Sequence, residues 1–128
     1  MEIVFLEKGS LGNDLDLSCF SELGHVTFYE LTKPEEVPER IRDADVIIVN
    51  KIPMNEATLS GASHLKLVAL TATGMNNIDF DYTNSHGIQV KNVAGYSTNA
   101  VAQHTFALLF YVLHRLAYYD NYVKSGAY

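Results

Sequence analysis

Cysteine is nearly absent from this sequence of 128 residues, and no stretch is dominated by proline, glycine or serine. The one cysteine, Cys19, excludes a disulfide framework and a cysteine-based metal site, which fits a reducing, cytoplasmic setting. The lack of biased segments argues against disorder. A chain of this length has enough residues for one hydrophobic core and too few for two.

Basic residues are also scarce. Nine lysines and arginines stand against fifteen acids, which gives a net charge of -6 and an isoelectric point near 5.2. Because phosphate contacts need clustered positive charge, we expect neither nucleic acid nor an anionic membrane surface as a partner. The first six residues have no basic flank, and their apolar run is too short for a targeting or membrane-spanning segment.

Several catalytic signatures are missing as well. The sequence has no Gly-x-Ser-x-Gly, no Walker phosphate loop and no Gly-x-Gly-x-x-Gly. Its five histidines lie at 25, 64, 86, 104 and 114 without ligand spacing, so no metal site is predicted. We expect His104, early in a long helical run, to be packed and hydrogen-bonded. Cys19 is expected to be a small core residue of a helix rather than a nucleophile.

What the sequence does contain is a regular alternation of strand-like and helix-like segments. Short apolar runs rich in strand formers occupy residues 3–6, 25–30, 45–50, 65–70 and 88–92. Helical patterns lie between them at 15–23, from Pro34 onward with Val37 and Ile41 on one face, at 55–62 and at 79–85. The alternation predicts an α/β fold, a flavodoxin-like doubly wound parallel sheet of about five strands.

The loops that follow the strands are the places to look for a ligand, because doubly wound sheets bind ligands outside the carboxyl ends of their strands. In the loop 71–77, Gly74 can free the backbone so that successive N–H groups hold a carboxylate. The same loop can instead be a tight turn in which Asn76 or Asn77 caps the next helix. Lys51, after the third strand, can neutralise an anionic substrate or be a solvated surface charge. A receiver domain needs an acid where Asn50-Lys51 stands, which argues against that class.

The longest helical run begins at Thr98 or Asn99, either of which is a suitable N-cap, and continues to about residue 124 without glycine or proline. Such a helix is about 40 Å long. Its segment 105–113 is apolar on every face and should be buried all round, yet it is too short to span a bilayer. We therefore expect another domain or another subunit to cover it, as in a homo-oligomer formed through the helix 98–124.

The run from Asn92 to His104 resembles a motif of the D-isomer-specific 2-hydroxyacid dehydrogenases, together with Thr71 to Asp79 and with Asn50-Lys51. The sequence is most similar to the glycerate dehydrogenase, or hydroxypyruvate reductase, branch. The resemblance covers the whole chain. It implies a substrate-binding (lid) domain in residues 1–97 and an interdomain helix in 98–128 that would open a dinucleotide-binding domain. The implied reaction is reversible hydride transfer between NAD(H) and a small 2-hydroxy or 2-keto acid.

The resemblance also implies roles for single residues. Backbone amides at Gly74 and Met75, with Thr73 in the same loop, would hold the substrate carboxylate, and Lys51 would lie beside the substrate. A hinge near the nicotinamide would be formed by Tyr96, Ser97, Thr98 and Val101.

Two departures from the family limit what the chain is expected to do. Gln103 stands where many relatives have Glu. The family's glycine fingerprint and its catalytic Arg, Glu and His would fall beyond residue 128, so no catalytic residue is assigned. We expect the chain by itself to be inactive, as the N-terminal part of such an enzyme. The alternative is a self-associating, non-catalytic binding or oligomerisation module.

Overall fold

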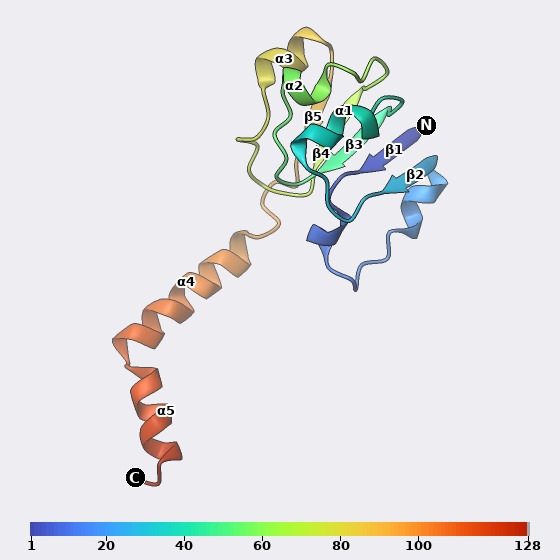
Figure 1. Cartoon of the computed structure of the whole chain (residues 1–128). Helices are drawn as coiled ribbons and strands as arrows, with labels where there is room; N and C mark the ends of the chain where they lie inside the picture. Colours follow the sequence, from blue (N-terminus) through green and yellow to red (C-terminus); the bar gives the residue numbers. More distant parts are fainter. Residues whose placement is uncertain (128) are drawn as a thin grey trace. The chain divides into compact units, whose positions relative to one another are not determined.

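The computed structural model describes residues 1–127, and the chain divides into two compact units, Met1–Ala94 and Gly95–Tyr128. The first unit contains all five strands (Figure 1). These are β1 Glu2–Phe5, β2 His25–Phe28, β3 Val46–Val49, β4 Leu67–Leu70 and β5 Gln89–Lys91. The second unit consists of the helices α4 Thr98–Leu113 and α5 Leu116–Lys124.

The sheet has the strand order β2-β1-β3-β4-β5, and every neighbouring pair is parallel. This is the flavodoxin-like order 2-1-3-4-5, so the predicted fold class is confirmed. The chain leaves β1 toward β2 on one side and reaches β3 on the other side. The order of the strands therefore reverses between β1 and β3, which makes this the point where such sheets bind ligands.

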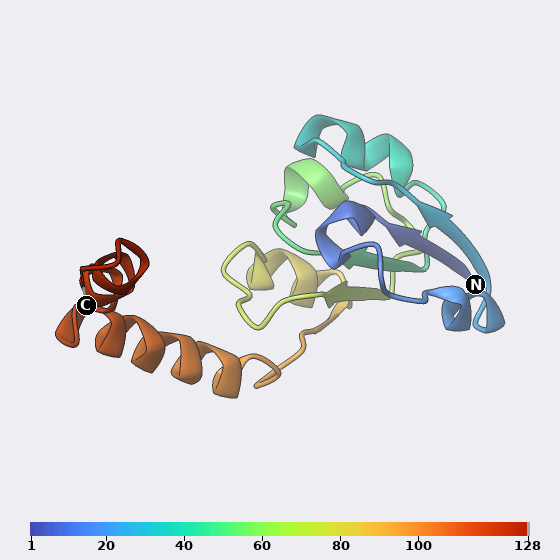
Figure 2. The same cartoon turned by 90° about the horizontal axis from the view of Figure 1, so that it is seen from below.

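Helical segments pack on both faces of the sheet. On one face, the largest core cluster includes Val37 of α1 Val37–Arg40 and Ile41, which follows that helix. It also includes Leu59 of α2 Glu56–Leu59. Tyr82 of α3 Phe80–Ser85 packs against the same cluster. The helices α1 and α2 lie side by side in both views (Figure 1 and Figure 2). Val37 and Ile41 are fully buried, as their spacing predicted.

The other face is covered in part, by single turns of 3-10 helix rather than by a regular α-helix. Leu11 of η1 Lys8–Leu11 and Phe20 of η2 Ser18–Glu22 pack on a small cluster that contains Phe5. The rings of Phe5 and Phe20 meet edge to face with their centroids 4.9 Å apart. Edge-to-face contact is a favourable arrangement for two aromatic rings, so this short segment is still held on the sheet.

The prediction of a helix over 15–23 is therefore wrong. A carboxylate oxygen of Asp16 accepts a hydrogen bond of 2.9 Å from the backbone N–H of Ser18. Such a local side-chain bond offers the backbone an alternative to helix formation. Cys19 lies in this turn and is exposed, so its expected place in the core is also wrong. The second predicted helix begins as expected with a proline, in the 3-10 turn η3 Pro34–Glu36 that runs into α1.

The predicted single helix over 98–124 is broken. Helix α4 ends at Leu113 and α5 begins at Leu116, because Arg115 adopts a left-handed backbone with φ 50 and ψ 43. The guanidinium of Arg115 lies 4.9 Å from the centre of the Tyr118 ring, a cation–π contact that favours this bend. Ser97 occupies the N-cap position of α4 without a side-chain capping bond, so neither Thr98 nor Asn99 is the cap.

The apolar segment of α4 is not buried by its own unit. No residue of α4 or of α5 is buried, and the exposed side chains include Phe106, Leu109 and Phe110. The expected all-round burial of 105–113 is therefore absent from the described chain. His104, which was expected to be packed, is exposed as well. None of the described helices is both long enough and apolar enough to cross a membrane.

Candidate functional site

Glu7 lies two residues after the end of β1 and connects two loops at the carboxyl-terminal edge of the sheet. Its side-chain Oε2 accepts hydrogen bonds from three consecutive backbone N–H groups, those of Asn50 at 2.7 Å, Lys51 at 2.8 Å and Ile52 at 3.4 Å. The parallel register of β1 and β3, with Phe5 opposite Ile48, brings the ends of the two strands together. The carboxylate therefore lies at the point where the strand order reverses.

Asn77 holds the same loop from its carbonyl side. The Nδ2 group donates to the backbone oxygen of Ile52 at 2.9 Å and to that of Asn50 at 3.4 Å. The carbonyl of Asn77 accepts from the backbone N–H of Met54 at 2.8 Å, and the N–H of Asp79 donates to the Met54 carbonyl at 2.9 Å. These bonds join the loop that carries Lys51 to the loop that follows β4.

In the loop 71–77, several backbone N–H groups have no described hydrogen-bond acceptor. Its carbonyl oxygens are used in the fold, since Val93 N–H donates to Ala72 at 3.1 Å and Asn92 Nδ2 donates to Thr73 at 2.7 Å. By contrast, among residues 1–127 no acceptor is found for the backbone N–H groups of 73–77. Thr73 and Gly74 are exposed, and Met75 is half-buried. An exposed run of unused N–H groups can hold a small anion.

Asp79, not Asn76 or Asn77, caps α3, since its Oδ1 accepts from the N–H of Tyr82 at 2.9 Å. The capping interpretation is therefore wrong. Gly74 does not have a positive φ, and a Cβ added there would meet only the Asn76 Oδ1, at 3.0 Å. Glycine is thus not required by backbone handedness, and the carboxylate role stays a prediction.

Lys51 combines a fixed backbone with a free side chain. Its N–H is bound by Glu7, whereas its side chain is exposed, and no described carboxylate forms an ion pair with its Nζ. The residues Lys51, Thr73, Gly74 and Met75 all belong to the loops after β3 and β4. The structure therefore brings the predicted substrate-binding residues to one edge of the first unit.

The predicted hinge residues lie at the start of the second unit. Gly95 has φ +75, a conformation that side chains other than glycine rarely adopt, and it precedes the first turn of α4. The N–H of Thr98 donates to the Gly95 carbonyl at 3.3 Å, and that of Val101 donates to the Ser97 carbonyl at 2.9 Å. Tyr96 is exposed. Their role as a hinge stays a prediction.

The carboxyls with shifted pKa values lie outside this edge. A backbone hydrogen bond from Glu2 and a side-chain bond from Lys66 lower the pKa of Asp45, which precedes β3. Hydrogen bonds from Ser18 lower the pKa of Asp16, which lies before η2. Among the described residues, no group of three or more His, Cys, Asp or Glu is placed to hold a metal ion.

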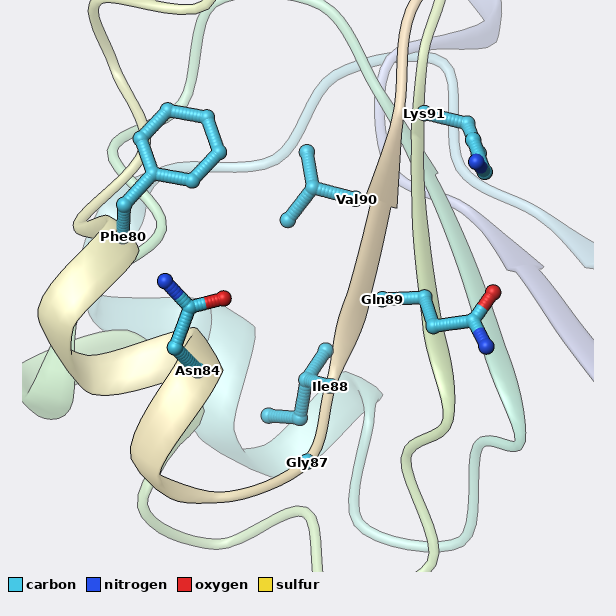
Figure 3. Close-up of a pocket in the computed structure, with 7 residues that line it drawn as sticks. All are labelled: Phe80, Asn84, Gly87, Ile88, Gln89, Val90 and Lys91. Atoms are coloured by element: carbon cyan, nitrogen blue, oxygen red, sulfur yellow. The ribbon is translucent and has the colours of Figure 1, made fainter.

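An open cavity of about 470 Å³ lies elsewhere, between α3 and the edge strand β5 (Figure 3). In Figure 3, Val90 and Ile88 point toward α3, and Phe80 lies across from Val90. None of the predicted site residues lines this cavity. The chemistry expected of the chain therefore belongs to the loops at the strand ends rather than to this cavity.

Comparison with known proteins decides the family. The sequence profile described as D-isomer specific 2-hydroxyacid dehydrogenase, catalytic domain, matches residues 3–124. The chain belongs to the D-isomer-specific 2-hydroxyacid dehydrogenases. The resemblance found in residues 50–51, 71–79 and 92–104 is confirmed by this match.

Two relatives of this dehydrogenase family illustrate the similarity. A Haemophilus influenzae protein classed as a 2-hydroxyacid dehydrogenase is 39% identical over 117 residues, which cover 91% of this chain and 37% of that protein. The glycerate dehydrogenase of Methylorubrum extorquens is 35% identical over 126 residues, 98% of this chain and 40% of the relative. The chain thus spans about two fifths of the length of these relatives.

Solved structures agree with the family assignment. An acyclic imino acid reductase in complex with NADPH and D-Arg superposes with a TM-score of 0.84 at 27% identity, over 98% of this chain and 41% of that one. The D-lactate dehydrogenase of Aquifex aeolicus, complexed with NAD and lactic acid, gives a TM-score of 0.77 at 26% identity, over 96% of this chain and 37% of the other. Both cover the two units described above.

Sequence reasoning missed Glu7 and misjudged Asn77. The sequence patterns assign no role to Glu7, and they predict only a helix-capping role for the Asn77 side chain. One signal was present for Glu7, since it is an acid placed immediately after the first strand, where the strand order of a flavodoxin-like sheet reverses. Its partners at 50–52 are more than forty residues away, so no local pattern could identify them.

Proposed function

We propose that this chain forms the substrate-binding part of an NAD-dependent D-2-hydroxyacid dehydrogenase. The enzyme interconverts a small 2-hydroxy acid and its 2-keto acid, such as glycerate and hydroxypyruvate. The single observation that carries the proposal is the loop 73–77, whose unused backbone N–H groups lie at the carboxyl edge of a sheet with this family's fold. The substrate class is supported by the names of the relatives, among them a glycerate dehydrogenase.

The substrate carboxylate binds to the backbone amides of Gly74 and Met75, with Thr73 beside them. Backbone N–H groups suit this task because they are fixed donors that need no ordering when the anion arrives. Lys51 lies next to the substrate and contributes positive charge. The bonds from Asn77 to the loop of Lys51 support this arrangement, because they hold the two substrate-binding loops in one geometry.

The cofactor is NAD, and it binds outside residues 1–97. Tyr96, Ser97, Thr98 and Val101 form a hinge near the nicotinamide ring. Complexes of structural neighbours with NAD and with NADPH support a nicotinamide cofactor. The isolated chain of 128 residues does not catalyse the reaction, and its location is cytoplasmic.

The test compares the chain with a fusion enzyme, in which residues 1–128 continue into the remaining part of the Methylorubrum extorquens glycerate dehydrogenase. NADH oxidation with hydroxypyruvate is followed by absorbance. We expect no turnover by the chain alone and turnover by the fusion enzyme. Turnover by the chain alone overturns the proposal that residues 1–128 are inactive by themselves. A folded but inactive fusion enzyme overturns the proposed function.

The carboxylate site is tested in the same fusion enzyme. Gly74→Pro removes one backbone donor and should raise KM for hydroxypyruvate by about tenfold or more, the usual effect of losing a hydrogen bond to a charged group. Asn76→Ala is the matched control, since Asn76 is exposed and makes no described hydrogen bond. An unchanged KM in the Gly74 variant contradicts the assignment of the carboxylate to this loop.

A second candidate is favoured by one specific observation, the exposed apolar surface of α4. In that case the chain is a self-associating binding module without catalytic function. The two candidates agree that copies of this chain form a homo-oligomer through residues 98–124. They differ in the fusion experiment, because a module without catalytic function gives no hydroxypyruvate-dependent oxidation of NADH in either form.

A further inference from the structure

The loop that carries Lys51 is held from both sides of its backbone. Three successive N–H groups, of residues 50–52, point to one oxygen of Glu7. Two carbonyl oxygens of the same segment, those of Asn50 and Ile52, accept from the Asn77 amide. Almost every polar backbone group of this short segment is therefore bound by a side chain from a different strand end. This is far more restraint than an exposed loop ordinarily has.

Successive backbone N–H groups that converge on one point form an anion-binding concavity. At the strand-order reversal of this sheet, that concavity is already filled by the chain's own carboxylate. The backbone of Glu7 is itself anchored, because Ser10 donates to its carbonyl from both the backbone N–H, at 3.0 Å, and Oγ, at 2.8 Å. The side chain thus extends from a fixed point to a fixed set of donors.

We propose that Glu7 is a positioning residue, an internal carboxylate ligand that fixes the backbone of Lys51 and, through Asn77, the loop 73–77. The bond network is independent of any reaction, whereas its effect on substrate binding rests on the proposed function. Glu7 does not touch the substrate. It fixes the position of the Lys51 backbone, from which the lysine side chain extends, and it fixes how the two substrate-binding loops lie relative to each other.

A carboxylate suits this position better than its close substitutes. Glutamine has the same shape and can present its one oxygen to the three donors, but it lacks the negative charge. Hydrogen bonds to an ionised acceptor are about twice as strong as neutral ones. Alanine removes the side chain and leaves the three N–H groups open, so a small free carboxylate can take the vacated place.

The first experiment uses the 128-residue chain and formate, with amide resonances read by NMR. Formate should shift the amides of residues 50–52 saturably in Glu7→Ala, and should not do so in the wild-type chain. Glu30→Ala is the matched control, because Glu30 is an exposed acid whose Oε1 pairs with the surface residue Lys8, at 2.7 Å. No saturable shift in Glu7→Ala, or equal shifts in the wild type, overturns the proposal.

A further variant keeps the test decisive if Glu7→Ala does not fold. Glu7→Gln preserves the size of the side chain, and its amides at 50–52 should exchange with solvent about tenfold faster than in the wild type, because charged hydrogen bonds are replaced by weaker ones. The amides of β3 serve as the internal reference. Unchanged exchange at 50–52 in this variant overturns the proposal.

The second experiment measures the consequence for substrate in the fusion enzyme. Glu7→Ala should raise KM for hydroxypyruvate about tenfold while kcat changes less than about threefold, because the carboxylate site is loosened rather than removed. Formate should partly restore KM once its inhibition of the wild type is subtracted. An unchanged KM in Glu7→Ala overturns the positioning role. A wild-type fusion enzyme without turnover instead overturns the proposed function, and the NMR result then decides the Glu7 network on its own.

Discussion

At the scale of the residue, Asp45 connects the amino-terminal ends of three strands. One of its oxygens accepts from the backbone N–H of Glu2 at 2.9 Å, and the other accepts from Nζ of Lys66 at 2.9 Å. The backbone bond is the main cause of its lowered pKa, and the lysine adds to it. A carboxyl whose folded-state pKa lies below its unfolded value stabilises the fold only when it is ionised.

The sign of the pH dependence follows from this shift. The contribution of Asp45 is fully present above its unfolded pKa, about 3.9, and is lost as the pH falls through the lower folded pKa. Asp45→Asn should therefore lower the urea midpoint at neutral pH, and its deficit should disappear in strong acid. Asp43→Asn is the control, because Asp43 is exposed and makes no described hydrogen bond. A deficit that stays constant with pH contradicts the prediction.

Single residues show where the sequence was informative about the site and where it was not. Lys51 and the loop of Gly74 could be found because each directly follows an apolar strand, and the carboxyl ends of parallel strands share an edge. The role of Glu7 could not be found, because it depends on three backbone donors of a loop that is distant in the sequence. Long-range bonds to backbone groups leave no trace in local patterns.

At the scale of the element, the strands were predicted well and the helices less so. Buried strands need continuous apolar runs, and these runs are visible in the sequence. Helix boundaries depend on individual hydrogen bonds instead, such as the one from Ser18 to Asp16 that accompanies a 3-10 turn where a helix was expected. The break between α4 and α5 could not be predicted either, because neither glycine nor proline marks it in the sequence.

Arg115 makes this break testable. A left-handed backbone costs a residue other than glycine about 1–2 kcal/mol. Arg115→Gly should remove most of that cost, so the amides of residues 114–118 should exchange more slowly while the break remains. Arg115→Ala keeps the cost and loses the contact with Tyr118, so α4 and α5 should join into one helix. The carbon chemical shifts at residue 115 report the backbone conformation, and identical shifts in the two variants would contradict the argument.

At the scale of the whole molecule, the two units differ in how far they bury their apolar side chains. The first unit buries two clusters of apolar residues, one on each face of its sheet. The second unit exposes large apolar side chains along both of its helices. Surface of this kind is typical of sites that bind another protein, a membrane or a ligand. The sequence pattern identified this apolar segment, because a run that is apolar on every side of a helix has no face for water. The partner that should cover it stays a prediction.

Self-association through α4 is therefore the expectation for the chain in solution. Leu109 is 46% exposed and lies in the all-apolar run, so Leu109→Asp places a charge where a partner copy should pack. Leu31→Asp is the matched control, since Leu31 is 72% exposed and belongs to the first unit. Sedimentation equilibrium should show a dimer or larger species for the wild type and for Leu31→Asp. Association of Leu109→Asp should be weaker by at least about a hundredfold, because an unpaired charge in an apolar contact costs several kcal/mol. A wild-type chain that stays monomeric, or equal association of the two variants, would exclude α4 as the contact.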